Sequence, residues 1–149
     1  MQPFPIQPET VVVFAATSIA LFIKGIVLSY LQVSWRVRDR AFERPEDARL
    51  MSLPPRQEPD VIGRVAAAWR NELESTPAFV SLAAGYVLLG GSALPLLLAS
   101  VAYVGARSFQ AFAQIRALQP QRTIGYLGGV LASASVAVMT GARVWSAMT

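Results

Sequence analysis

The chain has 149 residues, of which 54% are hydrophobic and 15% are charged, and its formal net charge is +4. A soluble domain carries about 25% charged residues, so the composition excludes a disordered chain and disfavours a soluble globule. Cys and His are absent, which excludes disulfides, thiolate zinc sites, and Ser-His-Asp or Cys-His catalytic groups. The basic residues flank apolar runs, which is typical of a membrane surface and does not indicate nucleic-acid binding. We therefore expect a single-domain, all-α integral membrane protein without a metal site.

The first predicted membrane span covers residues 10–35 and is charge-free except for Lys24. It is long enough to cross a bilayer, which takes about 20 apolar residues. Arg36 and Arg38 follow it, where a signal peptide would have a small-residue cleavage site, so we expect a retained helix with Trp35 at the interface. A lysine inside a span usually snorkels or pairs with a neighbouring helix, so Lys24 alone indicates no function.

An uncharged stretch over residues 78–106 is too long for one span and too short for two. Gly90-Gly-Ser-Ala-Leu-Pro95 in its middle predicts a turn. The second and third helices therefore extend into their charged flanks, over residues 61–90 and 94–117. A fourth span covers residues 121–145. The expected fold is a bundle of four transmembrane helices.

Positive charge is distributed asymmetrically about these spans. Residues 36–74 contain eight of the 13 Lys and Arg residues, whereas the N-terminal segment and the turn at 90–95 contain none. The positive-inside rule then places both termini outside and the loop at about 36–60 in the cytoplasm, together with the connection between the third and fourth spans. Polar ends of all four helices converge on that side, so we expect a polar site that faces the cytoplasm.

Two polar stripes near those helix ends are candidates for the site. Arg70, Asn71 and Glu74 share a helix face, because residues three or four apart are neighbours on a helix. They fit either a solvated, ion-paired helix end or a polar site that faces the bundle interior. A second stripe, on the third span, suggests an inward face or a cavity and consists of Arg107, Gln110 and Gln114.

The fourth span begins with Arg122 and Thr123, and Tyr126 follows one turn later. An Arg and a Tyr at a membrane entrance usually anchor the helix, so their spacing alone does not indicate a site. Small residues at four-residue steps along this helix predict close helix packing, within a subunit or between subunits. They are Gly125, Gly129, Ser133, Ala137 and Gly141.

Three motifs, in order, resemble the MAPEG family, the membrane-associated proteins in eicosanoid and glutathione metabolism. Residues 70–79, Arg-Asn-Glu-Leu-Glu-Ser-Thr-Pro-Ala-Phe, resemble the family's Arg/Leu-Asn-Asp-Leu-Glu-Asn-x-x-Pro-Phe signature. Residues 36–48 are similar to its Arg-x-Arg…Ala-Phe-Ala-Asn-Pro-Glu-Asp run, and residues 120–126 to its Pro-x-Arg-Ser-x-x-Tyr segment. The resemblance covers nearly the whole chain and is closest to the branch of the microsomal glutathione transferases and prostaglandin E synthase.

The resemblance implies a four-helix bundle that assembles as a homotrimer in the lipid bilayer and binds glutathione between subunits near the cytoplasmic face. It implies that Arg122 lies near the glutathione sulfur, with Thr123 in place of the family's Ser. Glu74 would bind the glutathione amino group, and Asp47 would belong to a loop that closes over the ligand. The full set of glutathione-binding residues that it implies is Arg36, Asp47, Arg70, Asn71, Glu74, Arg107, Gln110 and Tyr126.

Departures from the family pattern keep several functions open. Ala67 stands where the family usually has an Arg, and Gln110 and Gln114 replace a His and a Tyr. The main hypothesis is a glutathione-dependent transferase or peroxidase, in which Arg122 stabilises a thiolate that attacks a lipophilic electrophile or hydroperoxide. The alternatives are a non-catalytic protein of this fold, a protein that uses another thiol, and a small transporter or channel. The Arg-rich, Cys-free composition suggests a bacterial inner membrane.

Overall fold

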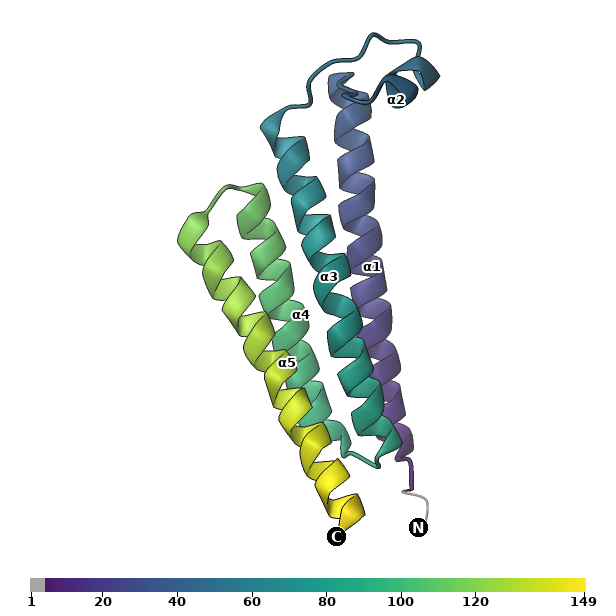
Figure 1. The fold of residues 1–149 in the computed structure, drawn as a ribbon, viewed down its shortest axis with the longest axis vertical. Coiled ribbons are helices and arrows are strands. Elements are labelled where there is room, and N and C mark those ends of the chain that lie inside the picture. The colour runs from purple at the N-terminus through teal and green to yellow at the C-terminus, as the bar shows by residue number, and fades with distance from the viewer. Residues whose placement is uncertain (1–4) are drawn as a thin grey trace.

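The structure, a computed structural model, describes residues 5–149. Over this range the chain forms α1 (Pro8–Asp39), α2 (Pro45–Leu50), α3 (Asp60–Leu88), α4 (Ala93–Ile115) and α5 (Gln119–Met148). The four long helices form a bundle, and the short α2 lies in the loop after α1 (Figure 1). Each long helix coincides with most of one predicted span. The division into membrane spans and a cytoplasmic loop stays a prediction.

Apolar length identifies the helices that suit a bilayer. Among the described helices, α1, α4 and α5 are long and apolar enough to cross a membrane. Charged residues occupy the first half of α3, between Asp60 and Glu74, and lower its hydropathy. Large apolar side chains of α1 such as Phe22 and Ile26 are exposed, as expected of a helix that faces lipid. The chain is an integral membrane protein.

Close packing against α4 explains Gly125 and Gly129 of the predicted small-residue series on α5, but not Gly141, whose added Cβ would meet nothing within 4 Å. A Cβ atom added to Gly125 would lie 2.8 Å from the backbone nitrogen of Gln110, and one added to Gly129 would lie 2.7 Å from Arg107 Cδ. These glycines therefore let the two helices approach within the subunit. The apolar core lies away from the α1–α3 loop, in the half of the bundle that contains the α3–α4 turn (Figure 1). It consists of Leu21, Phe79, Ala83, Tyr86, Val87, Leu96, Ala99, Tyr103, Ala132 and Val136.

Hydrogen-bonded turns place the polar loops at one end. The α3–α4 turn has Gly90 at φ 67°, and its Ser92 N–H donates to the Tyr86 hydroxyl at 3.1 Å. At the end of α4, Ala117 has φ 57° and the Leu118 N–H donates to the Ala113 carbonyl at 2.8 Å, which is a Schellman cap. As a result, the α1–α3 loop and the α4–α5 turn lie toward one end, opposite the start of α1 and the end of α5 (Figure 1).

Candidate functional site

A polar cavity of about 410 Å³ lies between α3, α4 and α5 toward the loop end. We call it the polar cavity. It brings together residues from two of the predicted stripes and from the start of α5. Its lining is Asn71, Gln110, Gln114, Arg122, Thr123 and Tyr126.

Buried amides form the inner wall of the polar cavity. The Asn71 amide nitrogen donates to Gln114 Oε1 at 2.8 Å. Gln110 Oε1 accepts a hydrogen bond from Arg107, whose guanidinium also donates to the Asn71 carbonyl at 2.5 Å. Gln110 and Gln114 are both buried. Their side-chain oxygens accept hydrogen bonds from Arg107 and Asn71 within the chain. Their NH₂ groups are the donors that they can offer to a ligand.

The opposite wall belongs to the first turns of α5. Arg122, Thr123 and Tyr126 are exposed on the chain surface. The Thr123 hydroxyl donates to the Gln119 carbonyl at 3.5 Å, a length at which a hydrogen bond is weak. The guanidinium and this hydroxyl can therefore turn toward an anionic ligand without breaking a strong internal bond.

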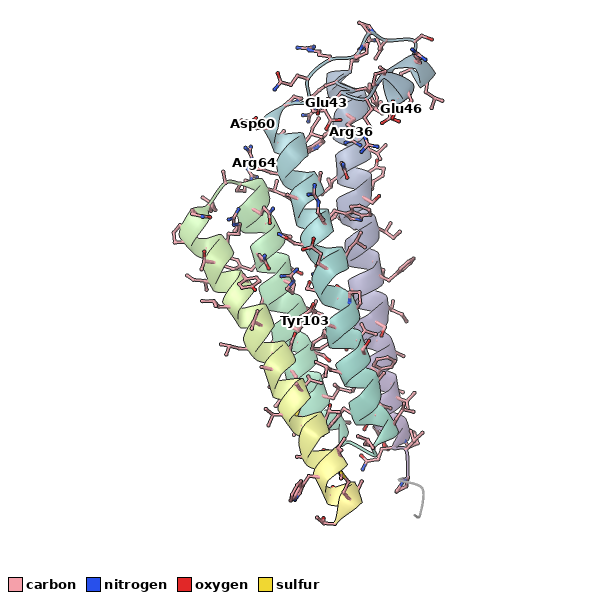
Figure 2. The ribbon with its side chains drawn as sticks, viewed as in Figure 1. Arg36, Glu43, Glu46, Asp60, Arg64 and Tyr103 are labelled. Atoms are coloured by element: carbon pink, nitrogen blue, oxygen red, sulfur yellow. The ribbon has the colours of Figure 1, made fainter. Side chains whose placement is uncertain are left out.

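A larger cavity of about 640 Å³ adjoins the polar cavity on the loop side and shares Gln114 and Arg122 with it. Both acidic and basic side chains line its rim. They are Glu43, Glu58, Asp60, Arg64 and Arg122. Arg64 Nε donates to the Ile115 carbonyl at 3.1 Å and fixes α3 to the end of α4. Figure 2 shows Arg64 and Asp60 at the start of α3, beside the α4–α5 turn. Ala67 also lines this cavity.

Several predicted site residues lie away from the polar cavity. The Arg36 guanidinium pairs with the Glu58 carboxylate, at 2.6 Å from Nε and 3.2 Å from Nη2. Asp47 is exposed on α2, and Arg70 and Glu74 are exposed on α3. Arg107 is buried behind the amide wall and acts on the cavity through Gln110. A single chain therefore assembles only part of the predicted set.

Sequence reasoning missed a buried charged cluster below the amide wall. Glu72 Oε2 lies 2.8 Å from Lys24 Nζ and 4.0 Å from Arg107 Nε. The Thr76 hydroxyl donates to Glu72 Oε1 at 2.8 Å. We call Lys24, Glu72 and Arg107 the charged triad. The sequence left open whether Lys24 snorkels or pairs with a neighbouring helix; the structure shows the pairing, with Glu72, which sequence reasoning did not single out.

The sequence matches the MAPEG family over residues 14–142. No curated protein matches the chain. Because the match covers most of the sequence, the chain belongs to the MAPEG family, as its motifs predicted. The family includes glutathione-dependent enzymes and also non-catalytic members. Assignment to the branch of the glutathione transferases and prostaglandin E synthase stays a prediction.

Proposed function

We propose that this member of the MAPEG family is a glutathione-dependent membrane enzyme of the transferase or peroxidase type. The observation that carries the proposal is that Arg122 and Thr123 line the same cavity as Asn71 and Gln110. Glutathione has two carboxylates, an ammonium group and a thiol. A guanidinium and amide N–H donors complement its carboxylates, because charge-assisted hydrogen bonds are the strongest of their kind.

Thiolate formation is the chemical step that we assign to Arg122. A free thiol has a pKa of about 8.5, and a nearby guanidinium lowers it. The proton leaves to water in the open cavity, and the Thr123 hydroxyl donates to the resulting thiolate. In conjugation, the sulfur forms a bond to an electrophilic carbon and the leaving group departs with its electron pair. With a hydroperoxide, the thiolate attacks the terminal oxygen and the O–O bond breaks. The alkoxide that leaves takes a proton from water to give the alcohol, and a second glutathione reduces the sulfenic acid to give a disulfide and water.

A homotrimer would complete the site, and MAPEG members are usually trimers. Arg70 and Glu74 are exposed on α3 at the same level as Asn71, so a neighbouring subunit can bind a ligand with them. Asp47 on α2 and the Arg36–Glu58 pair would face the same interface near the loop end. We further propose that α3 also crosses the membrane, as the second of four spans, with its charged half toward the cytoplasm of a bacterial inner membrane.

A non-catalytic protein, or an enzyme that uses another thiol, is the second candidate. The supporting observation is that Ala67 lines the larger cavity and that Gln110 and Gln114 supply neutral amides. These residues offer less positive charge than the family pattern. A saturable glutathione Kd below about 1 mM, which corresponds to about −4 kcal/mol, favours the enzyme.

The experiment is a calorimetric titration of the detergent-purified protein with glutathione, followed by a conjugation assay with a lipophilic aryl halide. We expect saturable binding in the wild type and in Arg143→Ala, which changes an arginine at the other end of α5. Arg122→Ala should keep part of the binding but lose at least tenfold in turnover, equivalent to about 1.4 kcal/mol. Equal turnover in Arg122→Ala and Arg143→Ala would contradict the assignment.

A further inference from the structure

A line of contacts joins Lys24 on α1 to the polar cavity, although Lys24 does not line that cavity. Lys24 Nζ lies 2.8 Å from Glu72 Oε2, and the same carboxylate oxygen lies 4.0 Å from Arg107 Nε. The Arg107 guanidinium in turn donates to Gln110 Oε1 and, at 2.5 Å, to the Asn71 carbonyl. Arg107 is therefore the link between the charged triad and the amide wall. That wall consists of Asn71, Gln110 and Gln114.

The Arg107 guanidinium determines which atoms of Gln110 face a ligand. A guanidinium has five N–H donors and no acceptor, so Gln110 can bind it only through its oxygen. A side-chain amide without such a partner could rotate and offer either its oxygen or its NH₂ group. With Oε1 bound to Arg107, Gln110 offers only N–H donors to the cavity that it lines. Such donors suit a carboxylate, which only accepts hydrogen bonds.

Two acceptors compete for the buried Arg107 guanidinium. The side chain is 5% exposed, and a Cβ atom added to Gly129 would lie 2.7 Å from Arg107 Cδ, so α5 lies directly against its stem. Within residues 5–149, Arg107 Nε has no hydrogen-bond partner. One competing acceptor is the amide wall, which the guanidinium contacts. The other is the Glu72 carboxylate, which lies within reach of Nε but is not bonded to it.

Lys24 decides this competition. A charge-assisted hydrogen bond to a carboxylate is about twice as strong as one to a neutral amide, so a free Glu72 would draw the guanidinium away from Gln110. Glu72 is not free, because its Oε2 lies closer to Lys24, at 2.8 Å, than to Arg107, at 4.0 Å. The Thr76 hydroxyl also donates to Glu72 Oε1 at 2.8 Å. Lys24 thus holds the carboxylate on the α1 side, and the guanidinium stays with the amides.

We infer that Lys24 is a positioning residue of the polar cavity: it holds Glu72, so that Arg107 orients Gln110 to bind a carboxylate of the ligand. The identity of this ligand, glutathione, rests on the proposed function, whereas the contacts do not. In Lys24→Met, Glu72 would pair with Arg107 and the fold would persist. The amide of Gln110 would then lose its fixed orientation.

The first test measures the Kd of S-methylglutathione by calorimetry on the detergent-purified protein, because this analogue has no ionisable thiol. Lys24→Met should weaken binding about tenfold, the effect of one lost hydrogen bond to a charged group, and Lys24→Arg should restore most of it. The diethyl ester of the analogue, in which both carboxylates are blocked, should bind equally to wild type and Lys24→Met. The control Tyr86→Phe changes a buried residue far from the triad and should leave both affinities unchanged.

Turnover separates positioning from catalysis. Lys24→Met should raise the KM for glutathione and leave kcat and the pKa of the bound thiol unchanged, because Arg122 is not affected. A lysine with a merely structural role would lower the amount of folded enzyme without changing KM.

The second test needs no ligand and follows unfolding in SDS. Gln110→Met should raise the unfolding equilibrium constant about fivefold in the wild type, the effect of one hydrogen bond, and leave it nearly unchanged in Lys24→Met. Gln114→Met is the matched control, because Gln114 Oε1 accepts from Asn71 and not from Arg107. Its effect should be the same in both backgrounds.

Equal affinity of wild type and Lys24→Met for S-methylglutathione would overturn the inference, as would an equal loss of affinity for the acid and for its diester. Additive effects of Lys24→Met and Gln110→Met on unfolding would also overturn it. If the wild type binds neither glutathione nor S-methylglutathione, the proposed function fails, and the unfolding comparison alone decides the role of Lys24. If Lys24→Met does not fold, Lys24→Gln replaces it in each test.

Discussion

Two buried cations, Lys24 and Arg107, depend on the single carboxylate of Glu72. Glu72→Gln keeps the shape of the side chain and removes its charge. Two unit charges 4 Å apart attract by about 4 kcal/mol at an effective dielectric constant of about 20. Removal of one partner from a buried pair costs about 3–5 kcal/mol in measured cases. Because Glu72 serves two cations, we expect a loss of unfolding free energy of about 3–5 kcal/mol.

The assay is reversible unfolding in mixed micelles of rising SDS fraction, followed by circular dichroism. Glu46→Gln is the matched control, because Glu46 is exposed on α2, and it should change stability by less than about 1 kcal/mol. Lys24→Met should cost less than Glu72→Gln, since Glu72 then retains Arg107. The double variant should cost less than the sum of the two single variants. A Glu72→Gln variant as stable as Glu46→Gln, or additive single effects, would refute the charged triad as a buried interacting unit.

Three further outcomes follow from the packing. Gly125→Ala places a methyl group against the α4 backbone and should destabilise the fold by about 1–3 kcal/mol. Gly141→Ala, whose added methyl group meets nothing within 4 Å, should be neutral or stabilising. Equal stability of the two variants in SDS unfolding would contradict the α4–α5 contact. Tyr86→Phe removes the acceptor for the Ser92 N–H and should cost about 1–3 kcal/mol in the same assay, and no loss would count against that bond. In right-side-out vesicles, Ser92→Cys should react with an impermeant maleimide and Ala117→Cys should not, and the reverse pattern would invert the proposed topology.

The sequence predicted the long helices from the length of their apolar runs, and the α3–α4 turn from its glycines. The uncharged run over residues 78–106 is divided between α3 and α4, and the Gly90-Gly91 pair lies in the turn between them, as predicted. Helix α2 was not predicted, although Pro45 at its first position and the acidic Glu46 and Asp47 after it are a helix-start signal. This helix has only six residues, and its pattern was not distinguished from the charged loop around it.

The site was harder to predict, because it depends on how the helices are rotated against one another. Helical spacing grouped Arg70 and Glu74 with Asn71, yet in the chain only Asn71 lines the polar cavity while Glu72 points to Lys24. A one-residue step turns a helix by about 100°, so spacing within α3 could not show which of its polar residues faces α1. The resemblance to the family grouped Asn71, Gln110, Arg122, Thr123 and Tyr126, which share a cavity in the chain, but its set also includes residues that do not line this cavity, namely Arg36, Asp47, Arg70, Glu74 and Arg107.

Thiolate activation by Arg122 is the central claim, and a pH titration of bound glutathione tests it most directly. The ultraviolet absorbance of the thiolate would be followed in the saturated complex of the wild type, of Arg122→Ala and of Arg143→Ala. We predict an apparent thiol pKa at least one unit below the free value of about 8.5 in the wild type and in Arg143→Ala, and a return toward the free value in Arg122→Ala. A bound thiol that titrates at the free value in the wild type, or a lowered pKa that Arg122→Ala leaves unchanged, would contradict the claim.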